Sequence, residues 1–242
     1  MIQRMVASAL FAGFVAGLLA AALHFALIEP ILLQAEMYES GQLVHVGVVP
    51  GGQGGATHDQ AAVAQPATPA APALAGPFEW RRHGLSVIFY GLLYCGYGLL
   101  LLAGVALAEV FGIRVEVRSG LIWGVAGFVA VVLAPAAGLP PELPGMAGGE
   151  VTLRQIWWVG TVVTTGAGLA LLGFGRGAAI FGLAVLLIAG PHVIGAPHPA
   201  VMTGPVPPEL AALFAGRTLG VAMAVWAVLG LVAVTIWNRQ RA

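Results

Sequence analysis

Lysine is absent from this chain, and aspartate and cysteine occur once each among its 242 residues. The absence of lysine excludes a P-loop, a Schiff-base enzyme and a Ser-x-x-Lys nucleophile pair, because each of these needs a lysine amine. The single aspartate, Asp59, lies in a polar, Gly-rich stretch, which excludes a pump that phosphorylates an aspartate. If the chain moves a solute, a gradient or another subunit must supply the energy.

Several enzyme and metal-site signatures are missing as well. The lone Cys95 lies inside a hydrophobic block, so it forms no internal disulfide, no Cys-x-x-Cys motif and no thiolate metal cage. There is no His-Glu-x-x-His and no Gly-x-Ser-x-Gly sequence, which weakens a membrane metalloenzyme without excluding one built on scattered histidines. The formal net charge is +0, so no basic stripe is available and nucleic acid is not an expected partner.

What the chain does contain is apolar sequence in long blocks. Hydrophobic residues make up 59% and charged residues 8% of the chain, whereas a soluble domain carries roughly a quarter charged residues. Because about 20 apolar residues span a bilayer, we expect an all-α, polytopic membrane bundle that forms a single domain over residues 1–242. Six blocks are long enough: Met5–Ile28, Gly84–Ala108, Ser119–Ala137, Ile156–Phe174, Gly177–Ile194 and Leu213–Trp237. The first block is too long for a signal peptide and is expected to be a retained anchor.

Arginine placement predicts the orientation of this bundle, because cytoplasmic loops carry an excess of positive residues. With both termini inside, the inner segments hold six arginines and the outer segments three, while Arg217 at a block edge is left uncounted. The inner ones are Arg4, Arg114, Arg118, Arg176, Arg239 and Arg241, and the outer ones are Arg81, Arg82 and Arg154. The longest outer segment contains an Ala/Pro/Gly/Gln-rich tract over residues 49–77, which we expect to be a disordered tether.

Glycine pairs within the blocks predict close helix contacts, because small residues let membrane helices approach each other. Three Gly-x-x-x-Gly pairs occur, at Gly13 and Gly17, at Gly120 and Gly124, and at Gly216 and Gly220.

On this topology all six histidines and eight of the ten acidic residues lie at or beyond the outer face, which suggests that the protein handles a cation there. One candidate is the stretch Gly138–Gly145, in which three prolines and two glycines surround Glu142. Such a stretch is expected to be rigid and non-helical. Glu142 is then either a positioned oxygen ligand or gate, or a solvated acid on a stiff turn.

A second candidate is the stretch Pro191–Pro199, which holds His192 and His198. Because a residue before proline is disfavoured in helical geometry, we expect the helix to break at Gly190 and to free backbone carbonyls beside His192. Neutral imidazoles suit first-row transition metals. The alternative is a helix end whose interfacial histidines bond carbonyl groups.

A third candidate lies at the outer end of the first block, where His24 is an ionisable residue inside a predicted span and therefore a functional candidate. Glu36 and Glu39 follow it and would share a helix face, whereas His83 is interpreted as an interfacial anchor. The predicted metal ligands are His24, Glu36, Glu142, His192 and His198, with Glu39, His45, His58 and Glu209 as weaker candidates.

Several of these stretches resemble the CbtA family, whose members are described as cobalt transporter subunits. The resemblance lies in Gly138–Gly145, Arg154–Trp158 and Pro191–Pro199, in Pro30–Glu39 after the first block, and in Trp123–Phe128 leading to Ala134-Pro135. It implies an inner-membrane protein for cobalt uptake that feeds cobalamin synthesis. It also implies a small partner of the CbtB type, with one spanning helix and a histidine-rich tail, and five spanning segments rather than six.

The prediction is therefore a lipid-embedded transporter subunit, not an enzyme, that captures Co²⁺ or Ni²⁺ at the outer face of the bacterial inner membrane and passes it inward. No tightly bound cofactor is expected, and self-association into a homo-oligomer is left open. The alternatives are a non-transporting scaffold for the small partner and a membrane-embedded metalloenzyme.

Overall fold

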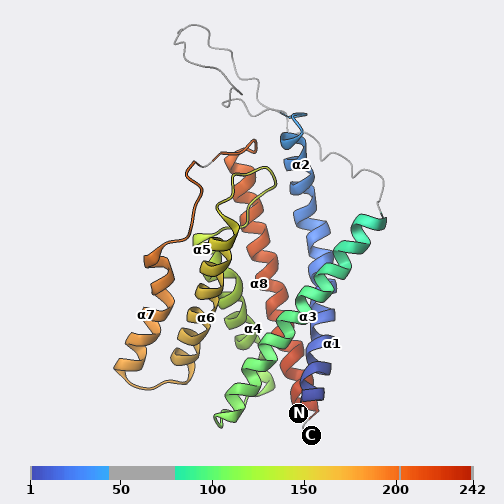
Figure 1. Cartoon of the computed structure of the whole chain (residues 1–242). Coiled ribbons are helices and arrows are strands. Elements are labelled where there is room, and N and C mark those ends of the chain that lie inside the picture. The colour runs from blue at the N-terminus through green and yellow to red at the C-terminus, as the bar shows by residue number, and fades with distance from the viewer. Residues whose placement is uncertain (1, 44–79, 202, 241–242) are drawn as a thin grey trace.

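The structure, a computed structural model, describes residues 2–43, 80–201 and 203–240, and this part of the chain is helical without any strand. The predicted tether at 49–77, together with His45 and His58, lies outside the described residues. Figure 1 shows the helices as an upright bundle, with the two termini at one end. The main helices are α1 (Ile2–Leu23), α2 (Glu29–Glu39), α3 (Trp80–Val110), α4 (Gly120–Phe128), α5 (Ala134–Gly138), α6 (Val151–Phe174), α7 (Ala178–Ile194) and α8 (Pro208–Arg239).

The predicted all-α membrane fold is confirmed. Five helical segments of the described chain are long and apolar enough to cross a membrane: Ile2–Glu39, Trp80–Val110, Val117–Gly138, Val151–Phe174 and Pro208–Arg239. The remaining apolar block forms α7, which has only 17 residues. At 1.5 Å per residue α7 is about 26 Å long, a little less than the hydrocarbon thickness of a bilayer.

Two of the spans contain a π-helical turn just before a proline. The turn η1 (His24–Ile28) joins α1 to α2 ahead of Pro30, and η3 (Val129–Leu133) joins α4 to α5 ahead of Pro135. Proline lacks an N–H and its ring clashes with the carbonyl four residues earlier. In both cases that carbonyl lies inside the wider π turn, which makes room for the ring. The helix therefore continues through each proline.

The structure corrects one predicted helix end and one predicted helix break. The first helix was expected to end at Ile28, but it runs on to Glu39 because η1 accommodates Pro30. The break expected at Gly190 is also wrong, because α7 continues through Pro191 to Ile194. The chain leaves α7 at Gly195, where φ is +88°, a conformation that glycine adopts at little cost.

Small residues form the contacts at the centre of the bundle. On α1, Ala9, Ala12 and Ala16 are fully buried, and a Cβ atom on Gly17 would lie 2.7 Å from both the Gly91 Cα and the Tyr90 carbonyl oxygen of α3. Close approach of this kind takes the place of hydrophobic drive between helices in lipid.

The other predicted glycine pairs differ from each other. Gly120 and Gly124 of α4 approach the backbone of α8 at Gly230 and Trp226, and the Trp226 side chain is buried beside them. At Gly216 and Gly220, a Cβ atom would meet no other atom within 4 Å, so this third pair makes no close helix contact within the described part of the chain.

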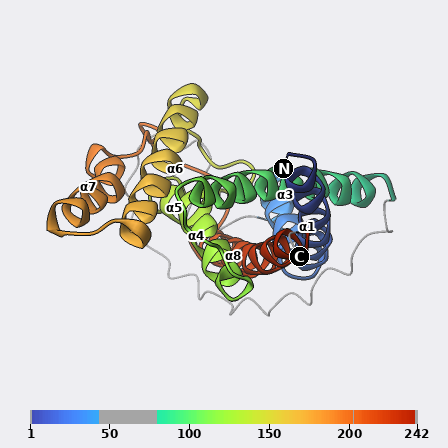
Figure 2. The same ribbon diagram turned by 90° about the horizontal axis from the view of Figure 1, so that it is seen from below.

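The two termini meet at the end of the bundle opposite the long loops. Arg4 donates a hydrogen bond from Nη1 to the Gln240 carbonyl at 2.8 Å, and Figures 1 and 2 both show the N- and C-terminal ends close together. Helix α7 packs mainly against α6 and lies at the periphery, as the view in Figure 2 makes clear.

The N-terminus of α6 is capped by Glu150. Its carboxylate accepts hydrogen bonds from the backbone N–H groups of Thr152 at 2.9 Å and Leu153 at 2.8 Å. These bonds favour the charged carboxylate and lower the pKa of Glu150. The cap therefore fixes the point at which the loop before α6 ends and the helix begins.

The α1–α3 contact predicts that Gly17→Ala destabilises the protein, whereas Gly220→Ala does not. The added methyl group at position 17 meets backbone atoms that cannot move aside, and we expect a loss of roughly 1–3 kcal/mol. At position 220 the space is open, and alanine favours the helix by up to about 1 kcal/mol. Thermal unfolding of the purified protein in detergent compares the two, and equal midpoints would contradict the contact.

The Glu150 cap predicts a pH-dependent loss of stability in Glu150→Ala. Because the pKa is depressed in the folded protein, the cap contributes its stability above the unfolded pKa near 4.5 and loses it as the pH falls through the folded pKa. We expect the variant to unfold at a lower temperature than the wild type at pH 7, and the difference to shrink as the pH falls below 4.5. A difference that persists unchanged in acid would point to a contact other than the charged cap.

Candidate functional site

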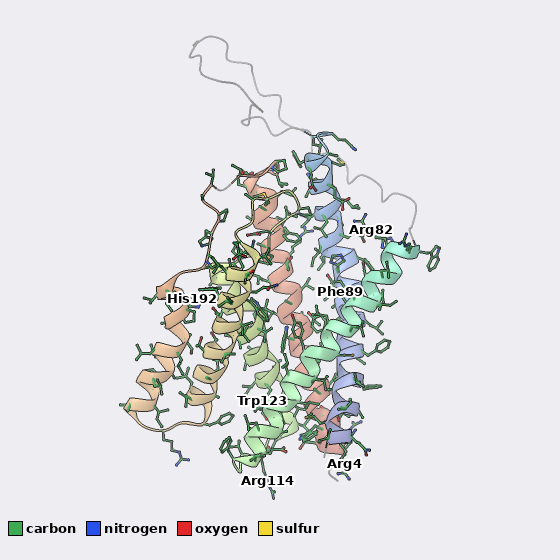
Figure 3. The ribbon with its side chains drawn as sticks, in the orientation of Figure 1. Arg4, Arg82, Phe89, Arg114, Trp123 and His192 are labelled. Atoms are coloured by element: carbon green, nitrogen blue, oxygen red, sulfur yellow. The ribbon has the colours of Figure 1, made fainter. Side chains whose placement is uncertain are left out.

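The predicted ligands lie in two separate places. His24 and Glu36 belong to the η1–α2 segment that faces α3, whereas Glu142, His192 and His198 lie around the outer end of α6. Figure 3 places His192 on α7 at the side of the bundle opposite Arg82 and Phe89 of α3. Within the described residues, no group of three or more His, Cys, Asp or Glu side chains is close enough together to hold a metal ion. The five candidates therefore do not share one ligand sphere in this structure.

Glu142 lies in a well-defined loop, but its carboxylate is already paired. Arg154 of α6 donates a hydrogen bond from Nη2 to Glu142 Oε2 at 2.9 Å. The loop is anchored by Leu143, which is buried, and it turns at Gly145, where φ is +78°. The loop therefore holds Glu142 in a fixed position, as the prolines around it predict. The cation that pairs with Glu142 in this structure is Arg154.

His192 and His198 flank the exit from α7. The His192 ring lies edge-on to Trp157, with 6.1 Å between ring centroids, and Trp157 Nε1 donates a hydrogen bond to the Pro191 carbonyl at 3.2 Å. His198 follows in the loop, and both His192 and His198 are exposed. This arrangement ties α7 to α6, and the two imidazoles remain candidate donors near the surface.

The outer loops pack on one another at the end of the bundle. Ala147 N–H donates to the Thr203 carbonyl at 2.8 Å, and Val206 is buried. A Cβ atom on Gly145 would lie 3.3 Å from Glu39 Cγ, so the loop before α6 also reaches the end of α2. Glu209 lies in the first turn of α8, where a carboxylate is favoured by the helix dipole.

A different set of polar side chains lines the interface between the first helical segment and α3. At the outermost level, Arg82 Nη2 lies 3.1 Å from Glu36 Oε1. At the next level, His83 Nδ1 lies 3.6 Å from Glu29 Oε1. At the innermost level, the Tyr90 hydroxyl lies 2.9 Å from His24 Nδ1. We call these six residues, His24, Glu29, Glu36, Arg82, His83 and Tyr90, the polar ladder.

Solvent exposure decreases from the outer level of the polar ladder to the middle one. The side chains of Arg82 and Glu36 are 41% and 47% exposed, whereas those of His83 and Glu29 are 17% and 13% exposed. Aromatic rings surround the lower levels, with Phe25 against His83 and Tyr90 against His24. A cation that moved along this interface from the outer level to the inner levels would lose water ligands and meet protein donors in their place.

Beside the innermost level lies a shallow, open hollow of about 330 Å³, lined by His24, Leu85, Ser86, Phe89 and Tyr90, of which Leu85 and Phe89 are exposed. In the tautomer in which His24 Nδ1 donates its proton to the Tyr90 hydroxyl, the Nε2 lone pair is available to a metal. Histidines that bind metals usually donate their second ring N–H to a carboxylate, a backbone carbonyl or water, which fixes the ring and the tautomer. The Tyr90 hydroxyl can therefore fix the orientation and the tautomer of the His24 ring.

Sequence reasoning assigned no binding role to four members of the polar ladder, namely Glu29, Arg82, His83 and Tyr90. A signal for Arg82 and Tyr90 was present, because Arg82, Ser86 and Tyr90 are spaced by four residues and form one polar stripe on a largely apolar helix. Glu29 lies just beyond Ile28, the predicted end of the first block, so the sequence predicts no helix that would bring it against α3.

Comparison with known proteins identifies one family. The family model described as "Probable cobalt transporter subunit (CbtA)" matches residues 2–238, nearly the whole chain. No curated protein and no solved structure matches significantly. The match and the apolar helices describe a multi-pass membrane protein of a transporter family, not of an enzyme family, and the word "subunit" implies a further component. The chain belongs to the CbtA family of probable cobalt transporter subunits.

Proposed function

We propose that this chain captures a divalent transition-metal ion, Co²⁺ in the first place, at the end of the bundle that carries the long loops, and passes it toward the end that carries the termini. The observation that carries this proposal is the polar ladder, with the His24–Tyr90 hydrogen bond at its innermost level. Ionisable side chains in a membrane span are costly and are a feature of ion pathways. The family match supplies the cargo.

The donors are chemically suited to such an ion. Imidazole and carboxylate bind cobalt, nickel, copper and zinc, and affinity alone favours copper over cobalt. We therefore propose that selection of Co²⁺ over Ni²⁺ rests on geometry and metal supply. Glu142, His192 and His198, with Glu39, Glu209, His45 and His58 as weaker donors, are proposed to concentrate the ion near the outer end of the bundle.

We further propose that the protein lies in the bacterial inner membrane with both termini in the cytoplasm. The excess of arginines at the terminal end supports this orientation, and so does the contact between Arg4 and Gln240, which puts both ends on one side. The proposed partner is a small subunit of the CbtB type with a single helix and a histidine-rich tail, as the family resemblance implies. Such a tail would deliver ions to the outer loops.

The proposal predicts that His24→Ala abolishes most cobalt uptake and that Tyr90→Phe weakens it roughly tenfold. The histidine is the proposed ligand, and loss of a partner that orients a metal ligand typically costs tenfold or more. Labelled-cobalt flux into liposomes, with and without the small subunit, measures both variants. Tyr97→Phe is the matched control, because it also removes a tyrosine hydroxyl from α3. Tyr97 packs on Trp226 rather than on His24.

Unchanged flux in His24→Ala would remove the polar ladder from the transport path. Flux that depends on the small subunit alone, and is the same with any variant of this chain, would instead identify the chain as a scaffold for its partner.

A further inference from the structure

Arg82 is placed where a cation would be expected in the upper part of the polar ladder. Its Nη2 atom lies 3.1 Å from Glu36 Oε1, and its Nε atom lies 4.0 Å from Glu29 Oε1. One guanidinium group therefore lies between two carboxylates that are two helical turns apart on α2. Its neighbour Arg81 makes no hydrogen bond or ion pair with any described residue.

Below Arg82, the pair formed by Glu29 and His83 has the spacing of two donors on a single metal ion. Nitrogen and oxygen ligands lie about 2.1 Å from a first-row divalent ion. Two such donors are therefore separated by about 3.0 Å at a 90° angle and by at most about 4.2 Å. The distance from His83 Nδ1 to Glu29 Oε1, 3.6 Å, falls within this range.

The pair formed by Glu29 and His83 is also largely, but not completely, shielded from solvent. Both side chains are less than one-fifth exposed, and the Phe25 ring lies edge-on to His83 with 5.1 Å between centroids. The positively charged Arg82 lies between this pair and the more exposed Glu36. A divalent ion that reached Glu29 with Arg82 in place would meet a like charge within a few ångströms, where the repulsion is large.

We propose that Glu29 and His83 form a binding site for a divalent first-row cation, and that Arg82 is a resident counter-cation that the metal must displace. This inference rests on the proposed function and adds to it a site above His24 and a residue that controls access. The Arg82 side chain is on the first turn of α3 and is 41% exposed, so it has room to swing toward solvent. When it leaves, Glu29 loses its resident counter-charge and becomes available to the metal ion.

Two protein donors completed by water make a weak site, which suits transport. Conduction requires that an ion bind well enough to arrive and weakly enough to leave. The structure agrees with this requirement, because no group of three metal-binding side chains is assembled among its described residues. Displacement of Arg82 also limits binding of monovalent cations, whose single charge competes less well with a guanidinium group for the carboxylates.

The test is Co²⁺ binding by the purified full-length protein, measured by titration calorimetry and by the visible absorption of bound cobalt. Arg82→Gln removes the resident charge, and we expect it to raise the affinity for Co²⁺ roughly tenfold. Arg81→Gln is the matched control, with the same change of charge one residue away, and it should leave the affinity within about twofold. The double variant Arg82→Gln/Glu29→Gln should lose the gain.

Equal affinities in Arg82→Gln and Arg81→Gln would overturn the role of Arg82. A gain in affinity that survives in Arg82→Gln/Glu29→Gln would overturn the role of Glu29. A gain that survives in Arg82→Gln/His83→Gln would likewise overturn the role of His83. If Arg82→Gln fails to fold, Arg82→Lys keeps the charge but cannot bridge two carboxylates, and it should show a smaller gain; wild-type affinity in that folded variant would reject the proposal.

The outcomes separate this inference from the proposed function. Loss of cobalt flux in His24→Ala, together with no effect of Arg82→Gln on binding or flux, would leave the transport proposal standing and reject the counter-cation. Loss of flux in neither His24→Ala nor Glu29→Gln would reject both.

Discussion

The approach of α1 to α3 at backbone distance is the contact on which the candidate site depends. Gly13 and Gly17 of α1 lie directly against the backbone of α3 around Tyr90, Gly91 and Cys95, and this contact fixes which residues of the two helices face each other. Beyond the contact, toward the outer loops, the two helices diverge, as Figure 1 shows. The space that opens is occupied by the polar ladder. Lipid could not solvate polar side chains at this depth, and two of the three levels, Arg82 with Glu36 and Tyr90 with His24, are hydrogen-bonded across the interface.

The remainder of the bundle supports this interface from behind. Helix α8 packs on both α1 and α4, with Trp226 buried against Gly124 and Gly127 and its ring tilted over Tyr97 of α3. Arg217 of α8 donates a hydrogen bond to the Leu27 carbonyl of η1 at 3.0 Å. The π turn that carries His24 is therefore held from one side by α8 and faces α3 on the other. By contrast, α6 and α7 form a peripheral pair, joined to the rest near η3 and α5.

Composition and block length were sufficient to predict the membrane fold, and the Gly138–Gly145 stretch was specific enough to indicate the family. The candidate site was predicted only in part. His24 and Glu36 were found because a charge in or near an apolar block is unusual, whereas Glu29 and Tyr90 were missed because their role depends on which helices are neighbours. No periodicity within one block shows that α1 pairs with α3. The pairing of Glu142 with Arg154 was hidden for the same reason, since twelve residues and a helix start separate them.

The single extra residue in η1 has a consequence for the direction in which the acidic side chains point. Each residue of an α-helix advances about 100° around the axis, and a π turn absorbs one additional residue. With the π turn absorbing one residue, Glu29 and Glu36 lie within about 20° of the direction of Gly17 around the helix axis. In a regular α-helix without the π turn, both would be rotated by roughly 100° away from that direction. Pro30 thus sets the phase of α2, so that the glycines that touch α3 and the carboxylates that face it occupy one continuous stripe.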